Sequence, residues 1–463
     1  MTRSHDLTAG SIPGHFRKLA VPAAIGMVFS TLYNVVDVYF AGTLGTEAQA
    51  GMAIAFQAFF VLIAAGIGLG AAMAALVGSA VGRNDLTAAR KIAAQGISYG
   101  IIATLVMVVL ELFLGPQLLI VISAPGAYRT AAIAYLMFLL LAAPGFVFAF
   151  GANGILQARG DTASMQYAMS VAFLANVGLD PLMMFGVPGL WNGLGFNGIA
   201  IATALSQTGV MCYILWRVSR LEMAKNLRLF EFRPEWATFS RITGQLLPTS
   251  FAMLVMILAS FVVQFYLKSF GEAAVAAYGI ALRIEQLFLL PVFGLTGALL
   301  PIAAQNFGAG NNNRVREALF DCWKFGWLFM CVACPLLWFA AEAAMRVFTK
   351  DASVIAIGIS YLHVDGMILP IYMMLFAVNA LLQALQKPVW TLWIGIYRQA
   401  FGVAFFVWIY VRWFNLGVTG VWFGIATSVL TGLLLSLVVA HKVSTPLIGG
   451  LWRSKRTTLT RTG

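Results

Sequence analysis

Charged side chains are scarce in this sequence, and their scarcity excludes a soluble globular protein. Asp, Glu, Lys and Arg make up 10% of the 463 residues, whereas soluble domains carry about a quarter. Hydrophobic residues supply 61% of the chain. Apolar runs of about 20 residues, the length of a membrane-spanning helix, recur throughout. The composition therefore predicts an all-α polytopic membrane protein.

Histidine and cysteine are also rare, with four of each. The histidines are scattered along the chain, so no metal-ligand spacing and no pairing of a nucleophile with a base is visible. Cys331 and Cys334 have the spacing of a redox pair, but they lie inside an apolar run, where packing is the simpler interpretation. We expect a protein that is not an enzyme and has no cofactor. A membrane-embedded enzyme is kept as an alternative.

Twelve apolar runs are long enough to cross a membrane. They lie at residues 18–40, 50–80, 92–114, 130–152, 163–186, 196–217, 245–269, 276–305, 318–340, 357–382, 390–411 and 418–440.

An internal repeat relates the two halves of the chain. Pro22 pairs with Pro248 and Gln157 with Gln383, and each pair is 226 residues apart. Each repeat contains six spans, and an even number gives both halves the same orientation in the membrane. The sequence therefore predicts two six-helix lobes. The predicted domains are an N-terminal lobe at 1–217, a cytoplasmic linker at 218–244, a C-terminal lobe at 245–441 and a basic cytoplasmic tail at 442–463.

Basic residues are unevenly divided between the two sides of the predicted spans. One set of loops, together with both termini, holds 22 of the 29 Lys and Arg residues, and the opposite loops hold five. Arg283 and Arg398 lie within spans. The positive-inside rule then predicts that both termini are cytoplasmic. The net charge of +12 reflects orientation and contact with the lipid bilayer, so no nucleic-acid partner is expected.

Two acids stand alone inside apolar runs of the N-terminal half. Asp37 lies in the first span, and Asp180 lies in the fifth, four residues after Asn176 and therefore on the same helix face. Thr203 of the sixth span lies at a similar depth, and Pro181 predicts a bend in the fifth. A carboxylate at membrane depth is costly and typical of an ion or proton pathway. We expect one coupling site, and the alternative is two separate structural acids.

The coupling ion stays open at this point. Two neighbouring carboxylates can take up a proton, and the oxygens of Asp37, Asn176, Asp180 and Thr203 can instead hold Na⁺. The partner of Asp37 in the repeat is Val263, and the partner region of Asp180 has no ionisable group. Ion coupling is therefore assigned to the N-terminal lobe.

The C-terminal half offers candidates for a substrate cavity. They are Arg283, Glu285, Met256, Met374 and Phe376. The alternative is charges neutralised by neighbours and ordinary helix packing. Glu111, His363 and Asp365 lie close to the outer ends of spans and are interpreted as interfacial.

Three loop motifs carry a family resemblance. They are Ser79 to Arg90 with Gly82 and Asp85, its repeat Pro301 to Arg316 with Gln305, Asn306 and Gly308, and Gln157 to Thr162 with Gly160. These motifs resemble those of the multidrug and toxic compound extrusion (MATE) family, and the resemblance covers nearly the whole chain. It implies a twelve-helix, V-shaped antiporter that exports drugs or metabolites against an inward flow of H⁺ or Na⁺. Together with the distribution of basic residues, the resemblance implies a place in the bacterial inner (plasma) membrane.

The resemblance also implies a coupling site. In some family members a polar cluster of the N-terminal lobe carries the ion, and the matching positions are Tyr33, Asp37, Asn153, Asn176, Asp180 and Thr203. Another branch uses acids in spans seven and ten, whereas the regions around Met256 and Tyr372 offer no carboxylate. This difference favours the branch that resembles the DNA-damage-inducible F protein.

The sequence thus predicts a secondary active multidrug exporter, acting as a monomer on amphiphilic or cationic small molecules, with alternating access by rocking of the lobes. A flippase for lipid-linked precursors is the first alternative. A channel is disfavoured because no repeated polar stripe lines a pore. The sequence does not specify the substrate.

Overall fold

The computed structural model describes residues 6–225 and 227–452. Residues 453–463 of the predicted basic tail therefore lie outside the described residues. Within the described residues, twelve helical segments are long and apolar enough to cross a membrane. This confirms the twelve predicted spans. The helices satisfy their own backbone hydrogen bonds, which is why hydropathy alone locates them.

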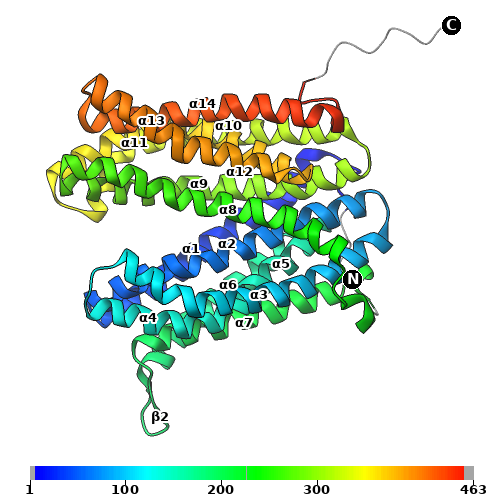
Figure 1. The fold of residues 1–463 in the computed structure, drawn as a ribbon, viewed down its shortest axis with the longest axis horizontal. Coiled ribbons are helices and arrows are strands. Elements are labelled where there is room, and N and C mark those ends of the chain that lie inside the picture. Colours follow the sequence, from blue (N-terminus) through cyan, green and yellow to red (C-terminus); the bar gives the residue numbers. More distant parts are fainter. Residues whose placement is uncertain (1–5, 226, 453–463) are drawn as a thin grey trace. The chain divides into compact units, whose positions relative to one another are not determined.

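The first six spans are formed by α1 to α7 (Figure 1). Their bounds are Ile12–Thr43 for α1, Thr46–Gly82 for α2, Leu86–Ile122 for α3, Ala127–Leu139 for α4, Ala143–Ala158 for α5, Ala163–Phe185 for α6 and Phe196–Ser219 for α7. A 3₁₀ turn, Leu140–Ala142, joins α4 and α5 into one span. Strands β1 (Gly186–Val187) and β2 (Trp191–Asn192) pair antiparallel between α6 and α7.

The last six spans are formed by α8 to α14. Their bounds are Trp236–Leu267 for α8, Glu272–Gly308 for α9, Asn312–Phe348 for α10, Ala352–Ala384 for α11, Pro388–Ile396 for α12, Val403–Trp408 for α13 and Gly417–Ile448 for α14. Span eleven contains two helices, α12 and α13, which are joined by the π-helical segment Tyr397–Gly402. A second π-helical segment, Ile409–Trp413, follows α13. Short π segments inside helices often mark functional sites.

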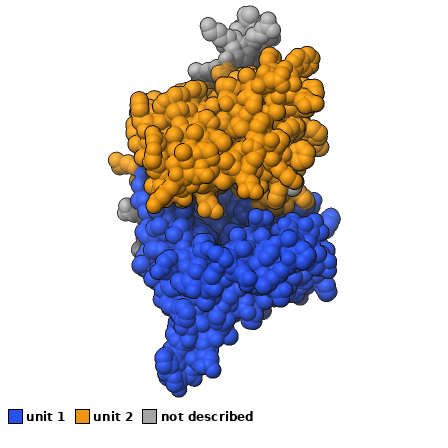
Figure 2. All heavy atoms as spheres, turned by 90° about the vertical axis from the view of Figure 1, so that its left-hand side faces the viewer, with its two compact units in different colours: residues 1–6, 21–250 blue, residues 7–20, 251–463 orange. Residues whose placement is uncertain are grey.

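The chain divides into two compact units, coloured separately in Figure 2. Unit 1 comprises residues 1–6 and 21–250, and unit 2 comprises residues 7–20 and 251–463. These bounds differ from the predicted lobes at two places. The predicted linker and the first residues of the predicted C-terminal lobe, 218–250, are part of unit 1, and residues 7–20, which include the start of α1, are part of unit 2.

Hydrogen bonds explain why the start of α1 belongs to unit 2. The backbone N–H of Leu7 donates to Gln305 Oε1 at 2.9 Å, and Asn306 Nδ2 donates to the Leu7 carbonyl at 3.0 Å. Both α9 residues belong to the loop motif identified in the sequence. Their side chains therefore hold the N-terminal segment, a long-range contact that local sequence patterns do not show.

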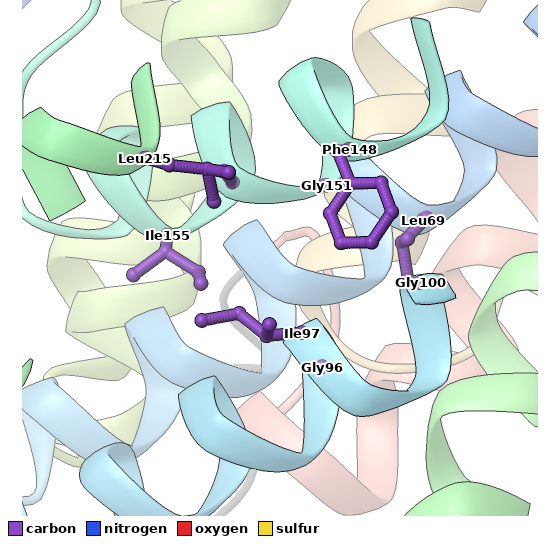
Figure 3. A pocket seen from close by; sticks show the side chains of 9 residues that line it. Leu69, Gly96, Ile97, Gly100, Phe148, Gly151, Ile155 and Leu215 are labelled. Atoms are coloured by element: carbon purple, nitrogen blue, oxygen red, sulfur yellow. The ribbon is translucent and has the colours of Figure 1, made fainter. Parts of the chain in front are cut away.

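Small residues pack α2 against α5 in unit 1. A Cβ at Gly70 would lie 2.7 Å from the Phe150 carbonyl oxygen, and one at Gly154 would lie 2.1 Å from the Gly70 carbonyl oxygen. These glycines let the two backbones approach closely, as in other membrane helix pairs. A small apolar cavity lies nearby, lined among others by Leu69, Gly151 and Leu215 (Figure 3). Its lining offers no polar side chain to orient a ligand.

Candidate functional site

Two buried aspartates of unit 1 share one asparagine. Asn176 of α6 donates through Nδ2 to Asp37 Oδ1 at 2.5 Å and to Asp180 Oδ2 at 3.0 Å. Its Oδ1 accepts a hydrogen bond from Ser206 Oγ of α7 at 3.1 Å. Thr203, also on α7, donates to Asp37 Oδ2 at 3.4 Å. Side chains from α1, α6 and α7 therefore form one hydrogen-bonded network, which we call the aspartate cluster (Asp37, Asn176, Asp180, Thr203 and Ser206).

Helix geometry explains how α6 supplies two members of the aspartate cluster. Asn176 and Asp180 are one turn apart and therefore lie on the same face. The helix continues past Pro181 to Phe185. Proline has no N–H, so the α6 backbone has one hydrogen bond fewer beside the carboxylate. Local sequence thus sets the spacing within α6, while tertiary packing brings α1 and α7 to it.

The aspartate cluster is almost completely removed from solvent. Asn176 and Asp180 have no exposed surface, and Asp37 is 7% exposed. None of the ion pairs found in the described residues involves either carboxylate. Asp180 Oδ1 is buried and, within that same part of the chain, has no hydrogen-bond partner. Two carboxylates in a low-dielectric interior repel each other strongly, so the arrangement favours binding of a cation or proton.

Tyr33 and Asn153, the other predicted members of the site, are both buried. The Tyr33 hydroxyl lies beside Thr203 and Ser206, one turn before Asp37 on α1, but it has no hydrogen-bond partner among the described residues. Asn153 lies on α5, and none of the hydrogen bonds found between described residues connects it to the aspartate cluster. Its Oδ1 also has no partner among them. The structure therefore places Tyr33 at the cluster and leaves Asn153 outside its hydrogen-bond network.

Ser206 was missed as a site residue. Late in each half the offset of the internal repeat changes from 226 to 222 residues, which pairs Ser206 with Ser428 and indicated a packing role for both. In the structure Ser206 donates to the Asn176 side chain, whereas Ser428 donates to the backbone carbonyl of Arg398 at 2.5 Å. The useful signal was helix spacing, because Ser206 follows Thr203 by three residues and shares its face.

The residues predicted to line a substrate cavity have different environments in unit 2. Glu285 is buried on α9 and accepts a hydrogen bond from the Tyr361 hydroxyl at 2.6 Å. Arg283 is exposed, and no ion pair within the described residues joins it to Glu285. Met256 is 43% exposed.

The two remaining cavity candidates lie on α11. The Met374 backbone carbonyl accepts a hydrogen bond from Trp323 Nε1 at 3.4 Å. The Phe376 ring stacks on Tyr372 with 6.1 Å between centroids, and it is tilted against Phe293 at 5.2 Å. Both residues thus take part in packing within unit 2.

Two further acids are buried inside the protein. Asp365 and Glu111, interpreted from the sequence as interfacial, are only 1% and 6% exposed. Asp365 also provides span ten with a carboxylate, about two turns before Tyr372 on α11, so the expectation that span ten offers none was wrong. Neither oxygen of Asp365 has a hydrogen-bond partner among the residues described.

A buried arginine belongs to the same unit. Arg398 lies on the π-helical segment of span eleven, and its guanidinium is 5.5 Å from the centroid of the Tyr372 ring. It interacts electrostatically with Glu285. Unit 2 therefore contains a built-in cation near its acids, whereas the acids of the aspartate cluster have no ion-pair partner among the described side chains.

The chain matches known proteins along most of its length. The MatE family model matches residues 22–182 and 248–408, two copies that are 226 residues apart, as the internal repeat predicts. An FAD transporter of Shewanella oneidensis is 29% identical over 366 residues, which cover 77% of this chain and 78% of the relative. The probable multidrug resistance protein NorM of Thermotoga maritima is 25% identical over 458 residues, covering 96% and 94%.

Solved structures agree with the fold. A transporter of the MOP superfamily from Pyrococcus furiosus has a TM-score of 0.89 at 25% identity, covering 96% of this chain and 99% of that one. An outward-facing multidrug resistance MATE transporter has a TM-score of 0.88 at the same identity and coverage. Together with the twelve spans and their repeat, these matches show that the chain belongs to the MatE family and is a multi-pass membrane transporter that exports small molecules.

Proposed function

We propose that this protein is a secondary active antiporter that exports amphiphilic or cationic compounds in exchange for H⁺ or Na⁺. The observation that carries the proposal is the pair of buried aspartates that share Asn176 without an ion-pair partner among the described side chains. Such a pair is unfavourable when empty and becomes favourable when a cation neutralises it.

Binding of the ion would change the hydrogen bonds that connect α1 to α6 and α7. In the cation-free site Asn176 donates charge-assisted hydrogen bonds to Asp37 and Asp180, which are stronger than those to a neutral group. Neutralising either acid weakens one of them. We propose that this change alters the bend of α1 or α6 and reshapes the substrate cavity, while the lobes rock to give alternating access.

Both coupling ions fit the residues present. A proton needs one carboxylate, and Asp180 Oδ1 is available for it. A sodium ion would take oxygens from Asp37, Asn176, Asp180 and Thr203, the residues that the network already gathers. The experiment has to distinguish the two.

The decisive assay is efflux of a fluorescent cationic drug from proteoliposomes under an imposed pH gradient and, separately, under an imposed Na⁺ gradient. Acceleration by the pH gradient that disappears in Asp37→Asn would support proton coupling through the aspartate cluster. Acceleration by Na⁺ alone would make the same cluster a sodium site. Glu272→Gln, an exposed acid at the start of α9, is the matched control and should leave efflux unchanged.

Two results would contradict the proposal. Retained coupled efflux in a well-expressed Asp37→Asn/Asp180→Asn double variant would exclude the aspartate cluster as the coupling site. Indifference of efflux to both gradients would exclude antiport and favour a lipid-linked precursor flippase.

Because one relative is named as an FAD transporter, FAD belongs among the substrates tested beside cationic drugs.

We also propose that both termini are cytoplasmic, that the protein is a monomer in the inner membrane, and that it is of the branch resembling the DNA-damage-inducible F protein. The distribution of basic residues supports the orientation. Labelling of an engineered terminal cysteine by an impermeant reagent in intact and in permeabilised cells tests it. Labelling in intact cells would reverse the orientation.

A further inference from the structure

The segment that leads into α8 is fastened along the start of α3. We call residues 227–236 the strap. Gln95 of α3 donates through Nε2 to the carbonyls of Glu231 at 2.8 Å and Arg233 at 2.7 Å, and its Oε1 accepts from the backbone N–H of Glu235 at 2.9 Å. Ser98 donates to the backbone carbonyl of Phe232 at 2.6 Å. The strap is therefore a fixed part of unit 1 that turns its backbone towards α3.

The acids of the strap are neutralised by α3. Arg90 donates to Glu231 with Nε at 2.6 Å and Nη2 at 2.8 Å, and Lys91 pairs with Glu235 at 2.7 Å. The bidentate contact with Arg90 lowers the pKa of Glu231 to about 2, so this carboxylate is ionised and bound at neutral pH. Both acids of the strap are therefore neutralised by basic residues of unit 1.

The basic residues of the strap remain exposed. Arg228 and Arg233 are exposed on the strap itself, and Lys225 and Arg241 are exposed just before and after it. Since the two strap acids are bound by α3, this surface has a net positive charge. A surface of this kind is complementary to anionic headgroups, and arginine suits phosphate oxygens in particular.

Large apolar side chains accompany these charges. Leu229 is 90% exposed, Phe230 is 58% exposed and Trp236 is 84% exposed. The strap lies between the end of α7 and the start of α8, so it is at one end of the membrane-spanning helices of unit 1. Aromatic and basic residues together at that level are typical of a membrane interface.

We propose that the strap is an interfacial anchor that binds anionic phospholipid. Leu229, Phe230 and Trp236 enter the headgroup region, and Arg228 and Arg233 bind the phosphates of acidic lipids. With the orientation proposed above, these lipids belong to the cytoplasmic leaflet. The class of lipid follows from the charge and apolar surface of the strap and does not depend on antiport.

The test places a probe on the strap of the full-length protein. Leu229→Cys is labelled with an environment-sensitive fluorophore after Cys212, Cys331 and Cys334 have been replaced by alanine. Nanodiscs contain phosphatidylcholine alone or mixed with phosphatidylglycerol. We expect blue-shifted emission and protection from acrylamide quenching with phosphatidylglycerol, and less of both with phosphatidylcholine alone. Raising NaCl from 0.1 to 1 M should reduce the difference, because the Debye length falls from about 10 to about 3 Å.

Charge variants make the test specific. Arg228→Gln/Arg233→Gln should reduce the ratio of protected to exposed probe by about 30-fold, since each basic residue near an anionic surface contributes about fivefold. Lys268→Gln/Lys350→Gln removes the same charge from exposed sites elsewhere and should have no effect. The proposal would be overturned if the probe were protected to the same extent in both lipids or quenched to the same extent in both. Protection by inorganic phosphate in detergent would also overturn it.

Discussion

Replacing Asn176 with leucine should stop coupled efflux. The change removes the donor shared by Asp37 and Asp180 and keeps a side chain of similar size. A hydrogen bond to a charged group contributes about 1.5–3 kcal/mol, so losing two disfavours the cation-free site by about 3–6 kcal/mol. Even the lower value changes an equilibrium constant by roughly 150-fold. The transporter should then remain in its cation-bound state and fail to complete its cycle.

Ser206→Ala is the graded comparison for this variant. It removes only the neutral hydrogen bond to Asn176 Oδ1, which contributes about 0.5–1.5 kcal/mol. Efflux from proteoliposomes should therefore fall by about tenfold or less in Ser206→Ala and by about 100-fold or more in Asn176→Leu. Drug binding and elution on gel filtration should be normal in both variants, which separates loss of coupling from loss of folding.

The gradient itself gives a second check. If the Asn176→Leu protein is stalled with its ion bound, lowering the ion concentration on the side of release should partly restore efflux. The reasoning is refuted if Asn176→Leu retains efflux within twofold of the parent, or if Ser206→Ala is as damaging. Either result would mean that Asn176 does not stabilise the ionised acids.

Four further outcomes follow from local contacts. Tyr361→Phe leaves buried Glu285 without its donor and should lower the free energy of unfolding by about 1–3 kcal/mol, seen as a lower midpoint of thermal unfolding in detergent. Gly154→Ala would place its Cβ 2.1 Å from a carbonyl oxygen of α2 and should destabilise by about 1–3 kcal/mol or more. In Gly209→Ala the added Cβ meets nothing within 4 Å and should be neutral or stabilising by up to about 1 kcal/mol in the same measurement. Finally, Glu231 has a pKa of about 2 against an ordinary 4.5, so its contact with Arg90 should stabilise the fold fully above pH 4.5 and be lost as pH falls towards 2. The measurement is the difference in thermal unfolding midpoint between the parent and Glu231→Gln as a function of pH, and a difference that disappears above pH 5 would contradict this.

The sequence by itself determined the spans, the repeat and the identity of the two principal acids. Apolar runs predict membrane helices because each helix satisfies its own backbone groups, so no distant partner is needed. Asp37 and Asp180 stood out for the complementary reason, since an ionisable group is expensive inside such a run. Asn176 and Asp180 could be placed on one face by their spacing alone.

Only the tertiary structure decided which side chains meet. Asp37 and Asn176 are 139 positions apart, and their hydrogen bond depends on how α1 packs against α6. Burial of Asp365, in contrast, could not be inferred from the sequence, because burial depends on the neighbouring helices. The strap is the clearest case: its sequence mixes charged and apolar residues and was interpreted as a linker, yet side chains of α3 about 140 positions away bind its backbone and its acids. Local sequence sets hydropathy and helix faces, while contacts between distant segments exist only after the helices have packed.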